Sequence, residues 1–312
     1  KESKKVILDE KFSSEEKIIK AYLIDIAKKT WLYFKENQVN YLPADNFQED
    51  RKEKIAMRTS PTNIGFSLMS AIASYDLHFE NLEDTIEFIN NEIDSVDMLK
   101  KWNGHLYNWY DLKTMQPLPP FDISSVDSGN FVGYLFTVKA FLGDCLDETN
   151  STRRVKSDYA VNESNSAGKI KSDYAGNEIN AIKRIGTDDV KLDVNYISKI
   201  LNLIDKITRL IDDTDFSKLY NKEIGLFSIG YSVSEGKLYD SYYDLLASEA
   251  RQTSIVAIAK KDVPSKHWAN LSRTLTSINQ YRGLVSWGGT TFEYLMPNII
   301  IPTYKGTLID ES

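Results

Sequence analysis

Residues 61–100 read PTNIGFSLMSAIASYDLHFENLEDTIEFINNEIDSVDMLK and contain two different helical patterns in succession. The first, 61–77, is apolar on nearly all sides and rich in small residues, which predicts a buried helix starting at Pro61 behind a capping Ser60. The second, 81–100, repeats apolar residues at helical spacing and carries acids in its first turn, which predicts an amphipathic helix. This stretch therefore predicts a buried helix followed by a half-exposed one.

The same alternation extends along the rest of the chain. Amphipathic helices are predicted over 15–36, 81–100, 193–212 and 265–279, and mostly apolar helices over 61–77, 128–143, 244–260 and from Thr290. An inner ring of buried helices wrapped by an outer ring is an α/α toroid, so the predicted fold class is all-α. The ring is of the six-fold barrel type but incomplete, with about four helix pairs. A protein-binding helical solenoid is disfavoured, because the pairs do not recur at a constant period.

The connections differ in length and composition. Those that lead from an outer helix to the next inner helix are long, aromatic and acidic, and they span 38–60, 101–127, 213–243 and 280–289. Short β-hairpins are predicted within 105–118 and 226–239. These loops should gather at one end of the barrel, above the N-termini of the inner helices, and that end is the expected functional site.

Composition excludes several classes of function. The 312 residues carry 38 Lys and Arg against 45 Asp and Glu, a net charge of -7, with no dense basic stripe, so a nucleic-acid partner is not expected. Cys145 is the one cysteine and only three histidines are present, so neither a disulfide nor a metal site is expected. No phosphate-binding loop or cofactor fingerprint occurs, so no cofactor is expected. No apolar run reaches the length of a membrane span, so this segment should not insert into a membrane.

Residues 149–190 interrupt the helical pattern with an imperfect tandem repeat of polar composition. KSDYAVNESNSAGKI at 156–170 is followed by KSDYAGNEINAIKRI at 171–185. Such a segment has few core-forming residues, so it is predicted to be a low-complexity insertion within a single domain spanning 1–312. A helical hairpin of its own is the alternative.

Two carboxylates are the main candidates for catalysis. Glu249 falls in an otherwise apolar helix, where burial would raise its pKa toward the range of a general acid; the alternative is an ion pair with Arg251 or Arg58. Asp127 is a second candidate, and it is equally suited to capping helix 128–143. Glycoside chemistry requires two facing carboxylates surrounded by aromatic platforms, and the sequence offers both.

Other side chains of the long loops are candidates for binding a sugar. Aromatic rings offer flat apolar faces for stacking, while charged and amide groups can bind hydroxyls. Glu293 lies one turn into the last predicted inner helix, where a structural hydrogen-bond acceptor is the alternative, and Asp111 is also suited to a turn. The predicted substrate-binding residues are Tyr107, Trp109, Tyr110, Asp111, Arg58, Trp287, Glu293 and Tyr243.

Six motifs occur in a characteristic order: DNFQED, RTSPTNIG, GHLYNWYD, SSVDSGN, YYDLLASEAR and GLVSWGGTTFEYLMP. Together they resemble the glucoamylase-like domain of bacterial cyclic β-1,2-glucan synthases, over nearly the whole chain apart from the repeat and the first dozen residues. The resemblance implies transglycosylation of a β-1,2-linked glucan, which closes a linear chain into a ring. It also implies a cytoplasmic location and fusion to membrane glucosyltransferase and phosphorylase-like regions.

The resemblance also implies roles for individual residues. Glu249, in the LASEAR match, corresponds to the general acid/base, and Asp127, in the VDSGN match, corresponds to a supporting carboxylate. Family members continue past the EYLMP motif with further helices and a further catalytic carboxylate, so the partner nucleophile is expected outside this chain. The alternatives are an endo-β-1,2-glucanase and a catalytically inactive glycan-binding fragment.

Overall fold

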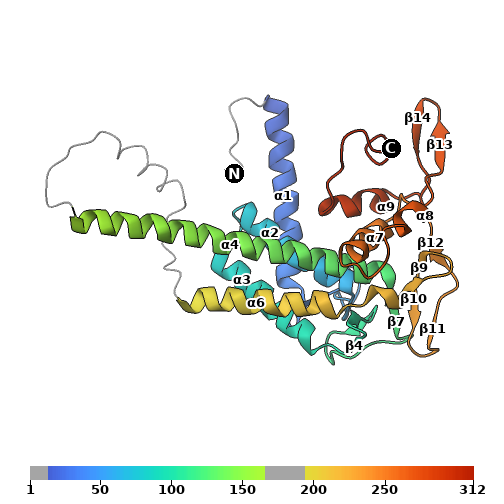
Figure 1. The fold of residues 1–312 in the computed structure, drawn as a ribbon, viewed down its shortest axis with the longest axis horizontal. Coiled ribbons are helices and arrows are strands. Elements are labelled where there is room, and N and C mark those ends of the chain that lie inside the picture. The colour runs from blue at the N-terminus through green and yellow to red at the C-terminus, as the bar shows by residue number, and fades with distance from the viewer. Residues whose placement is uncertain (1–12, 166–193) are drawn as a thin grey trace. The chain divides into compact units, whose positions relative to one another are not determined.

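The computed structural model describes residues 13–165 and 194–312 as a helix-rich chain with only short strands (Figure 1). The helices are α1 (Ser14–Glu36), α2 (Pro61–Asp76), α3 (Leu82–Met98), α4 (Ser125–Asn165), α6 (Val194–Asp213), α7 (Ala250–Ala259), α8 (His267–Asn270) and α9 (Thr291–Leu295), with 3₁₀ turns η1 (Phe216–Lys218) and η2 (Met296–Ile299). The first three predicted pairs of amphipathic and buried helices are therefore present.

The chain divides into two compact units, one formed by Lys1–Lys139 with Lys206–Ser312 and the other by Ala140–Asp205. Helices α4 and α6 each pass from one unit into the other. The predicted insertion begins inside α4, which continues to Asn165, so the first part of the repeat is helical. The rest of the repeat lies outside the described residues, and the single-domain prediction stays a prediction.

Helices α2 and α3 form as their sequences predict. The Ser60 hydroxyl accepts a hydrogen bond from the Asn63 N–H at 3.2 Å, with Pro61 at the first helical position. The Asn81 side chain caps α3 in the same way by accepting from the Asp84 N–H. Helix α2 packs against both α1 and α3. The apolar stripe of α3 is fully buried there, as Ile86, Ile89, Ile93 and Val96 show.

Helix α1 differs from α3 in the environment of its apolar stripe. A capping box between Ser13 and Glu16 starts the helix. The stripe nevertheless stays in solvent, with Ile18 70% and Tyr22 65% exposed, and Trp31 is the one buried residue among residues 15–36. The periodicity predicted the helix correctly. Burial of the stripe would require a neighbouring element on this face, and the described residues place none there.

The segment before α7 corrects a predicted helix. Helix α7 starts at Ala250, six residues later than the predicted 244–260, so Asp244 is not its cap. The Leu246 N–H donates to the Ser272 carbonyl at 3.0 Å, and the Ser272 N–H donates to the Asp244 carbonyl at 2.6 Å. Because these backbone groups pair across the chain, residues 244–249 cannot also form a helical turn.

The predicted amphipathic helix 265–279 is wrong. This region contains the four-residue α8 and then the hairpin of β13 (Leu275–Ile278) and β14 (Tyr281–Leu284). Leu271 and Leu284 pack with Leu246 and Ala247 in a small core cluster, which fixes the region against the segment before α7. The fourth helix pair is therefore missing from the described residues, although α9 begins behind Thr290 as predicted.

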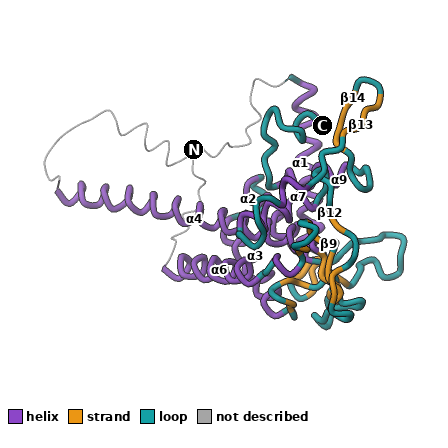
Figure 2. Tube along the Cα trace, turned by 45° about the vertical axis from the view of Figure 1, so that its right-hand side comes forward, coloured by secondary structure: helices purple, strands orange, loops and turns teal. Residues whose placement is uncertain are grey.

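The remaining strands belong to the loops and form small antiparallel sheets (Figure 2). They are β1 (Gln38–Val39), β2 (Leu42–Pro43), β3 (Arg58–Thr59), β4 (Lys101–Trp102), β5 (His105–Leu106), β6 (Tyr110–Asp111), β7 (Asp122–Ser124), β8 (Tyr220–Asn221), β9 (Leu226–Ser228), β10 (Gly230–Ser232), β11 (Lys237–Leu238) and β12 (Tyr242–Tyr243). The hairpin predicted within 226–239 is β10–β11. In the region of the other predicted hairpin, an antiparallel bridge joins Tyr110 to Pro117. In addition β5 pairs with β4 and β6 pairs with β3, so loop 101–118 is tied to the start of α2.

Candidate active site

The N-terminal ends of four helices, α2, α4, α7 and α9, meet around a group of carboxylates. Thr62 in the first turn of α2 donates its hydroxyl hydrogen to Asp127 Oδ1 of α4 at 2.6 Å. The charges of Asp127 and of Glu293 in α9 both raise the pKa of Glu249, at the start of α7. Electrostatic coupling of this kind requires short separations, so residues far apart in the sequence lie in one region.

Asp127 is not the cap of its helix. Helix α4 starts at Ser125, and the Asp127 N–H donates to the Ser124 hydroxyl at 3.1 Å, so Ser124 provides the cap. The Asp127 carboxylate is thereby left to accept from Thr62. Burial raises the pKa of Asp127, and the hydrogen bonds from Ser124 and Thr62 oppose that rise.

Glu249 combines partial burial with an unpaired carboxylate. It occupies the cap position of α7 but makes no side-chain cap hydrogen bond. Desolvation raises the pKa of Glu249 to about 7, and repulsion from Asp127 and Glu293 contributes to the rise. A carboxyl group with such a pKa exists in both protonation states near neutrality, which suits general acid and general base work.

The alternative of an ion pair for Glu249 is wrong for both proposed partners. The Arg251 guanidinium donates to the Tyr294 carbonyl and to Asn298 Oδ1. Arg58 pairs with Asp45, with the nearer nitrogen and oxygen 3.0 Å apart. Within the described part of the chain no cation therefore neutralises Glu249.

Tyr243 lies among the same acids. Its phenol is half-buried on β12, and desolvation together with the charges of Glu249, Asp127 and Glu293 raises its pKa. The hydroxyl is therefore neutral at any ordinary pH, and it offers one hydrogen to a carboxylate or to a substrate oxygen.

Glu293 has a structural task that Glu249 lacks. It forms a capping box with Thr290 at the start of α9, and its carboxylate accepts from the Gly288 N–H at 2.8 Å and the Thr290 N–H at 3.3 Å. These bonds hold the turn that carries Trp287, whose side chain is 59% exposed. The structure thus gives Glu293 the acceptor role that the sequence left open, next to the other acids.

The aromatic loop 107–111 divides into core and surface residues. The prediction that Tyr110 binds substrate is wrong, since it is fully buried and its hydroxyl accepts from the Tyr107 N–H and donates to the Lys100 carbonyl. Tyr107 is 4% exposed and leaves almost no surface for a ligand. Asp111 has the turn role, because its Oδ1 accepts from the Lys113 and Thr114 N–H groups.

Trp109 and Arg58 lie against each other at the surface. The Arg58 guanidinium carbon is 4.1 Å from the centroid of the Trp109 ring. Asp45 Oδ2 accepts from Nε and Nη2 of the same guanidinium, and Asp45 Oδ1 accepts from Asn63 Nδ2 of α2 at 3.1 Å. This cluster connects the loop before α2 directly to the first turn of α2.

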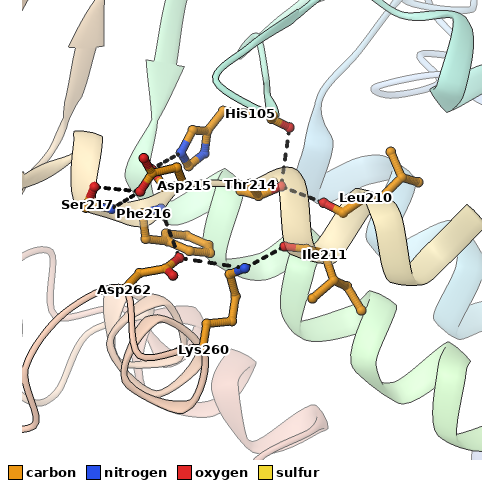
Figure 3. Close-up of polar contacts among 10 residues, drawn as sticks. His105, Leu210, Ile211, Thr214, Asp215, Phe216, Ser217, Lys260 and Asp262 are labelled. Atoms are coloured by element: carbon orange, nitrogen blue, oxygen red, sulfur yellow. Dashed lines mark hydrogen bonds and ion pairs between the residues drawn. The ribbon is translucent and has the colours of Figure 1, made fainter.

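His105 is a core residue. Its Nδ1 lies 3.0 Å from the Ser128 hydroxyl and its Nε2 lies 2.9 Å from the Asp215 carbonyl. Burial lowers the pKa of His105 to about 4, so the imidazole is neutral at pH 7. Figure 3 shows it beside the turn after α6, where Lys260 donates to the Ile211 carbonyl and Asp262 accepts from the Phe216 N–H. These contacts connect loop 101–127, the turn after α6 and the end of α7.

Several polar residues behind the carboxylates were not predicted as site residues. Asn130 donates to the Thr62 hydroxyl at 3.1 Å, and Gln252 donates to the Asn130 carbonyl at 3.4 Å. The side-chain oxygens of Asn130 and Gln252 are buried and accept no hydrogen bond. Tyr134 also lies here, because the charge of Glu249 contributes to its raised pKa. The three-residue spacings from Asp127 to Asn130 and from Glu249 to Gln252 place these side chains on the same helix face as the acids.

The described ranges contain neither a cluster of metal ligands nor a membrane-spanning helix. Among residues 13–165 and 194–312, no group of three or more His, Cys, Asp or Glu side chains is placed to hold a metal ion. No helix in these ranges is both long and apolar enough to cross a membrane.

The fold places the chain in a known structural class. An endo-β-1,2-glucanase from Chitinophaga pinensis matches 88% of this chain and 57% of its own length with a TM-score of 0.61 at 11% identity. A glucoamylase-like protein from Bacteroides caccae matches 87% of this chain and 57% of its own length with a TM-score of 0.60 at 14% identity. The described chain therefore has the glucoamylase-like fold.

The sequence comparison is more specific. The chain is 31% identical, over 92% of its length, to the cyclic β-(1,2)-glucan synthase NdvB of Rhizobium meliloti, and it spans 13% of that relative. No model of a protein family matches the chain. The resemblance predicted from the six motifs is thus confirmed: the chain is related to a segment of a cyclic β-1,2-glucan synthase. The fused regions and the cytoplasmic location stay predictions.

Proposed function

We propose that this chain acts on β-1,2-linked glucan by transglycosylation, with Glu249 as the general acid/base and Asp127 as a supporting carboxylate. The observation that carries the proposal is the state of Glu249, whose unpaired carboxyl group has its pKa raised to about 7 beside two other acids. Structural ion pairs perturb pKa values too, but Glu249 has no cation beside it among the described residues. The relationship to the synthase segment supports the choice of substrate.

The chemistry follows from a change in the protonation state of Glu249. As the acid, Glu249 donates its proton to the glycosidic oxygen while the bond from that oxygen to C1 breaks, and the departing sugar leaves as an alcohol. A second carboxylate bonds to C1 as that bond breaks. A sugar hydroxyl then displaces this carboxylate from C1, and Glu249, now a carboxylate, accepts the hydroxyl proton. The charge of Asp127 favours the protonated form of Glu249 before the first step and stabilises positive charge that develops at C1.

Transglycosylation requires that a sugar hydroxyl, and not water, reaches C1. Aromatic side chains that hold sugar units and displace water favour that outcome. Two aromatic side chains suit this role, Trp109 beside the start of α2 and the exposed Trp287 in the turn before α9. Tyr243 offers a neutral hydroxyl among the acids, which suits a role in orienting the substrate.

The test is incubation with linear β-1,2-glucan. A longer synthase polypeptide that carries this segment within its full domain should form cyclic products without net release of reducing ends. Unchanged glucan with that polypeptide would contradict the proposal. Full activity in a Glu249→Gln variant would contradict the assigned role of Glu249.

A plain endo-β-1,2-glucanase is the second candidate, because the fold also matches endo-β-1,2-glucanases from Chitinophaga pinensis and from Talaromyces funiculosus. Net release of reducing ends would favour this function. Binding of β-1,2-glucan without turnover would instead indicate a glycan-binding fragment.

A further inference from the structure

Loop 38–60 and loop 101–127 meet at a polar cluster in front of α2. Strand β3 pairs with β6 in the register Arg58↔Asp111 and Thr59↔Tyr110. This pairing brings Arg58 against Trp109, the residue directly before β6, so that the guanidinium lies 4.1 Å from the ring centroid. The contact is therefore fixed by backbone pairing, and the two side chains are ordered before any ligand binds.

Asp45 fixes the other edge of the guanidinium. Its Oδ2 accepts from Arg58 Nε at 3.1 Å and Nη2 at 3.0 Å, and from Asn46 Nδ2 at 2.9 Å. Its Oδ1 accepts from Asn63 Nδ2 at 3.1 Å. Four donors thus converge on one carboxylate whose side chain is only 16% exposed, while that of Arg58 is 48% exposed.

The cluster retains unused hydrogen-bonding capacity at its surface. Among the described residues, no acceptor is bonded to Arg58 Nη1 and no donor to Asn63 Oδ1. The Trp109 ring is half-buried, and the Arg58 guanidinium covers one of its two faces. A flat ring beside fixed donors and acceptors matches a pyranose, which has apolar C–H faces and hydroxyls at its edge.

The charges favour a neutral ligand. The positive charge of Arg58 is balanced by Asp45, so the cluster has no excess charge to attract a phosphate or a carboxylate. The chain as a whole carries a net charge of -7, which also disfavours an anionic polymer. An uncharged sugar chain needs no excess charge in the cluster and is not repelled by the net negative charge.

The cluster lies close to the acids. Arg58 precedes Thr62 by four residues, so their Cα atoms are at most about 14 Å apart. The Thr62 hydroxyl is itself bonded to Asp127. A glucan of a few units can therefore extend from the acids to Trp109.

We propose that Trp109, Arg58, Asp45 and Asn63 form a binding subsite for a neutral glucosyl unit of a β-1,2-linked chain, some units away from the bond that is cleaved. The face of Trp109 opposite Arg58 provides the stacking surface. Arg58 and Asn63, both held by Asp45, bind the hydroxyls. The inference rests on the proposed function for the identity of the sugar, but it concerns binding and not turnover.

The test measures the affinity for linear β-1,2-glucans of increasing defined length by calorimetry, in the Glu249→Gln background so that no product forms. Trp109→Ala should weaken the binding of long chains about tenfold and leave the shortest chains unaffected. Trp109→Phe, which retains a flat ring, should recover most of the loss. Tyr22→Ala on α1, which removes an aromatic ring 65% exposed, should change nothing and serves as the control.

Because Trp109 is half-buried, thermal unfolding must show that the Trp109→Ala variant is folded. Arg58→Gln is the second variant, at a side chain that is 48% exposed. It should also weaken only the long chains. An equal loss at every chain length, or no loss in either variant, would overturn the subsite. Length-dependent binding through Trp109, together with no turnover when Glu249 is intact, would leave the subsite intact and contradict the proposed function. Turnover with Glu249 intact but no length dependence of binding would do the reverse.

Discussion

The starts of α7 and α9 use the same residue type for opposite purposes. The oxygens of Glu293 are occupied by the Gly288 and Thr290 N–H groups, so this glutamate completes a helix cap. Those of Glu249 bond to no described residue, and its pKa is raised to about 7. The sequence predicted both near the starts of buried helices. Their difference shows that a carboxylate becomes available for proton transfer when the fold buries it and places no hydrogen-bond donor beside it.

The largest expected effect is that of Glu249→Gln. The amide is nearly isosteric but cannot release a proton, so turnover of linear β-1,2-glucan should fall by about 10²–10⁴-fold. Cyclic and reducing-end products are the readout, and Glu293→Gln, which keeps an acceptor in the cap, should cause a smaller loss. A larger loss in Glu293→Gln would reverse the comparison between the two glutamates.

Asp127→Asn should move the pH dependence of turnover. Because Glu249 acts first as a proton donor, kcat/KM should fall as the pH rises through about 7. Removing the charge of Asp127 removes repulsion that disfavours ionised Glu249, so the pKa of Glu249 should decrease. The fall in kcat/KM on the alkaline side of the pH profile, the basic limb, should then begin at a lower pH. If that pKa decreases by about one, the rate above the limb should be about tenfold lower. An unmoved limb would show that Asp127 does not act through Glu249.

Glu293→Ala should affect mainly stability. Loss of the capping box should cost about 1 kcal/mol in the free energy of unfolding, which lowers Tm by about 2–4 °C in a chain of this size. Thermal unfolding measures the effect, and Glu293→Gln, which can still accept in a capping box, should recover most of it. Equal destabilisation by Glu249→Ala would contradict the distinction, since that side chain makes no cap bond.

The smallest effect is expected for Thr62→Val. The variant removes the hydrogen bond that favours ionised Asp127. Asp127 should then be protonated more readily, and the basic limb should move in the same direction as in Asp127→Asn but less far. Thr62→Ser, which retains the hydroxyl, is the matched control and should behave as the unvaried chain does. A shift larger than that of Asp127→Asn would contradict this order.

Local signals in the sequence were reliable where the chain interacts with its near neighbours. The Ser60 cap, the start of a helix near Thr290 and the first three amphipathic helices were all predicted from spacing and composition. Prediction failed where backbone groups pair with distant segments. Residues 244–249 pair with Ser272 instead of forming a helical turn, and 265–279 form a short helix and a hairpin packed on Leu246.

The fate of side chains was harder to predict than the position of helices. Tyr110 and Trp109 are neighbours in an aromatic loop, yet one is sealed in the core and the other lies at the surface under Arg58. The apolar stripes of α1 and α3 have the same period, yet that of α1 stays exposed. Burial depends on what the rest of the fold brings against a side chain, and periodicity carries no information about that.

The amino-acid sequence alone determined that this protein is built from alternating buried and amphipathic helices, and its motifs determined its relationship to a glucan synthase segment. Only the tertiary structure decided which carboxylate is unpaired, because that depends on donors that come from separate helices. Helix caps and hydrophobic periods are encoded within a few residues of each other. The pKa of Glu249 is set by burial and by two charges from distant parts of the chain, so it exists only in the folded protein.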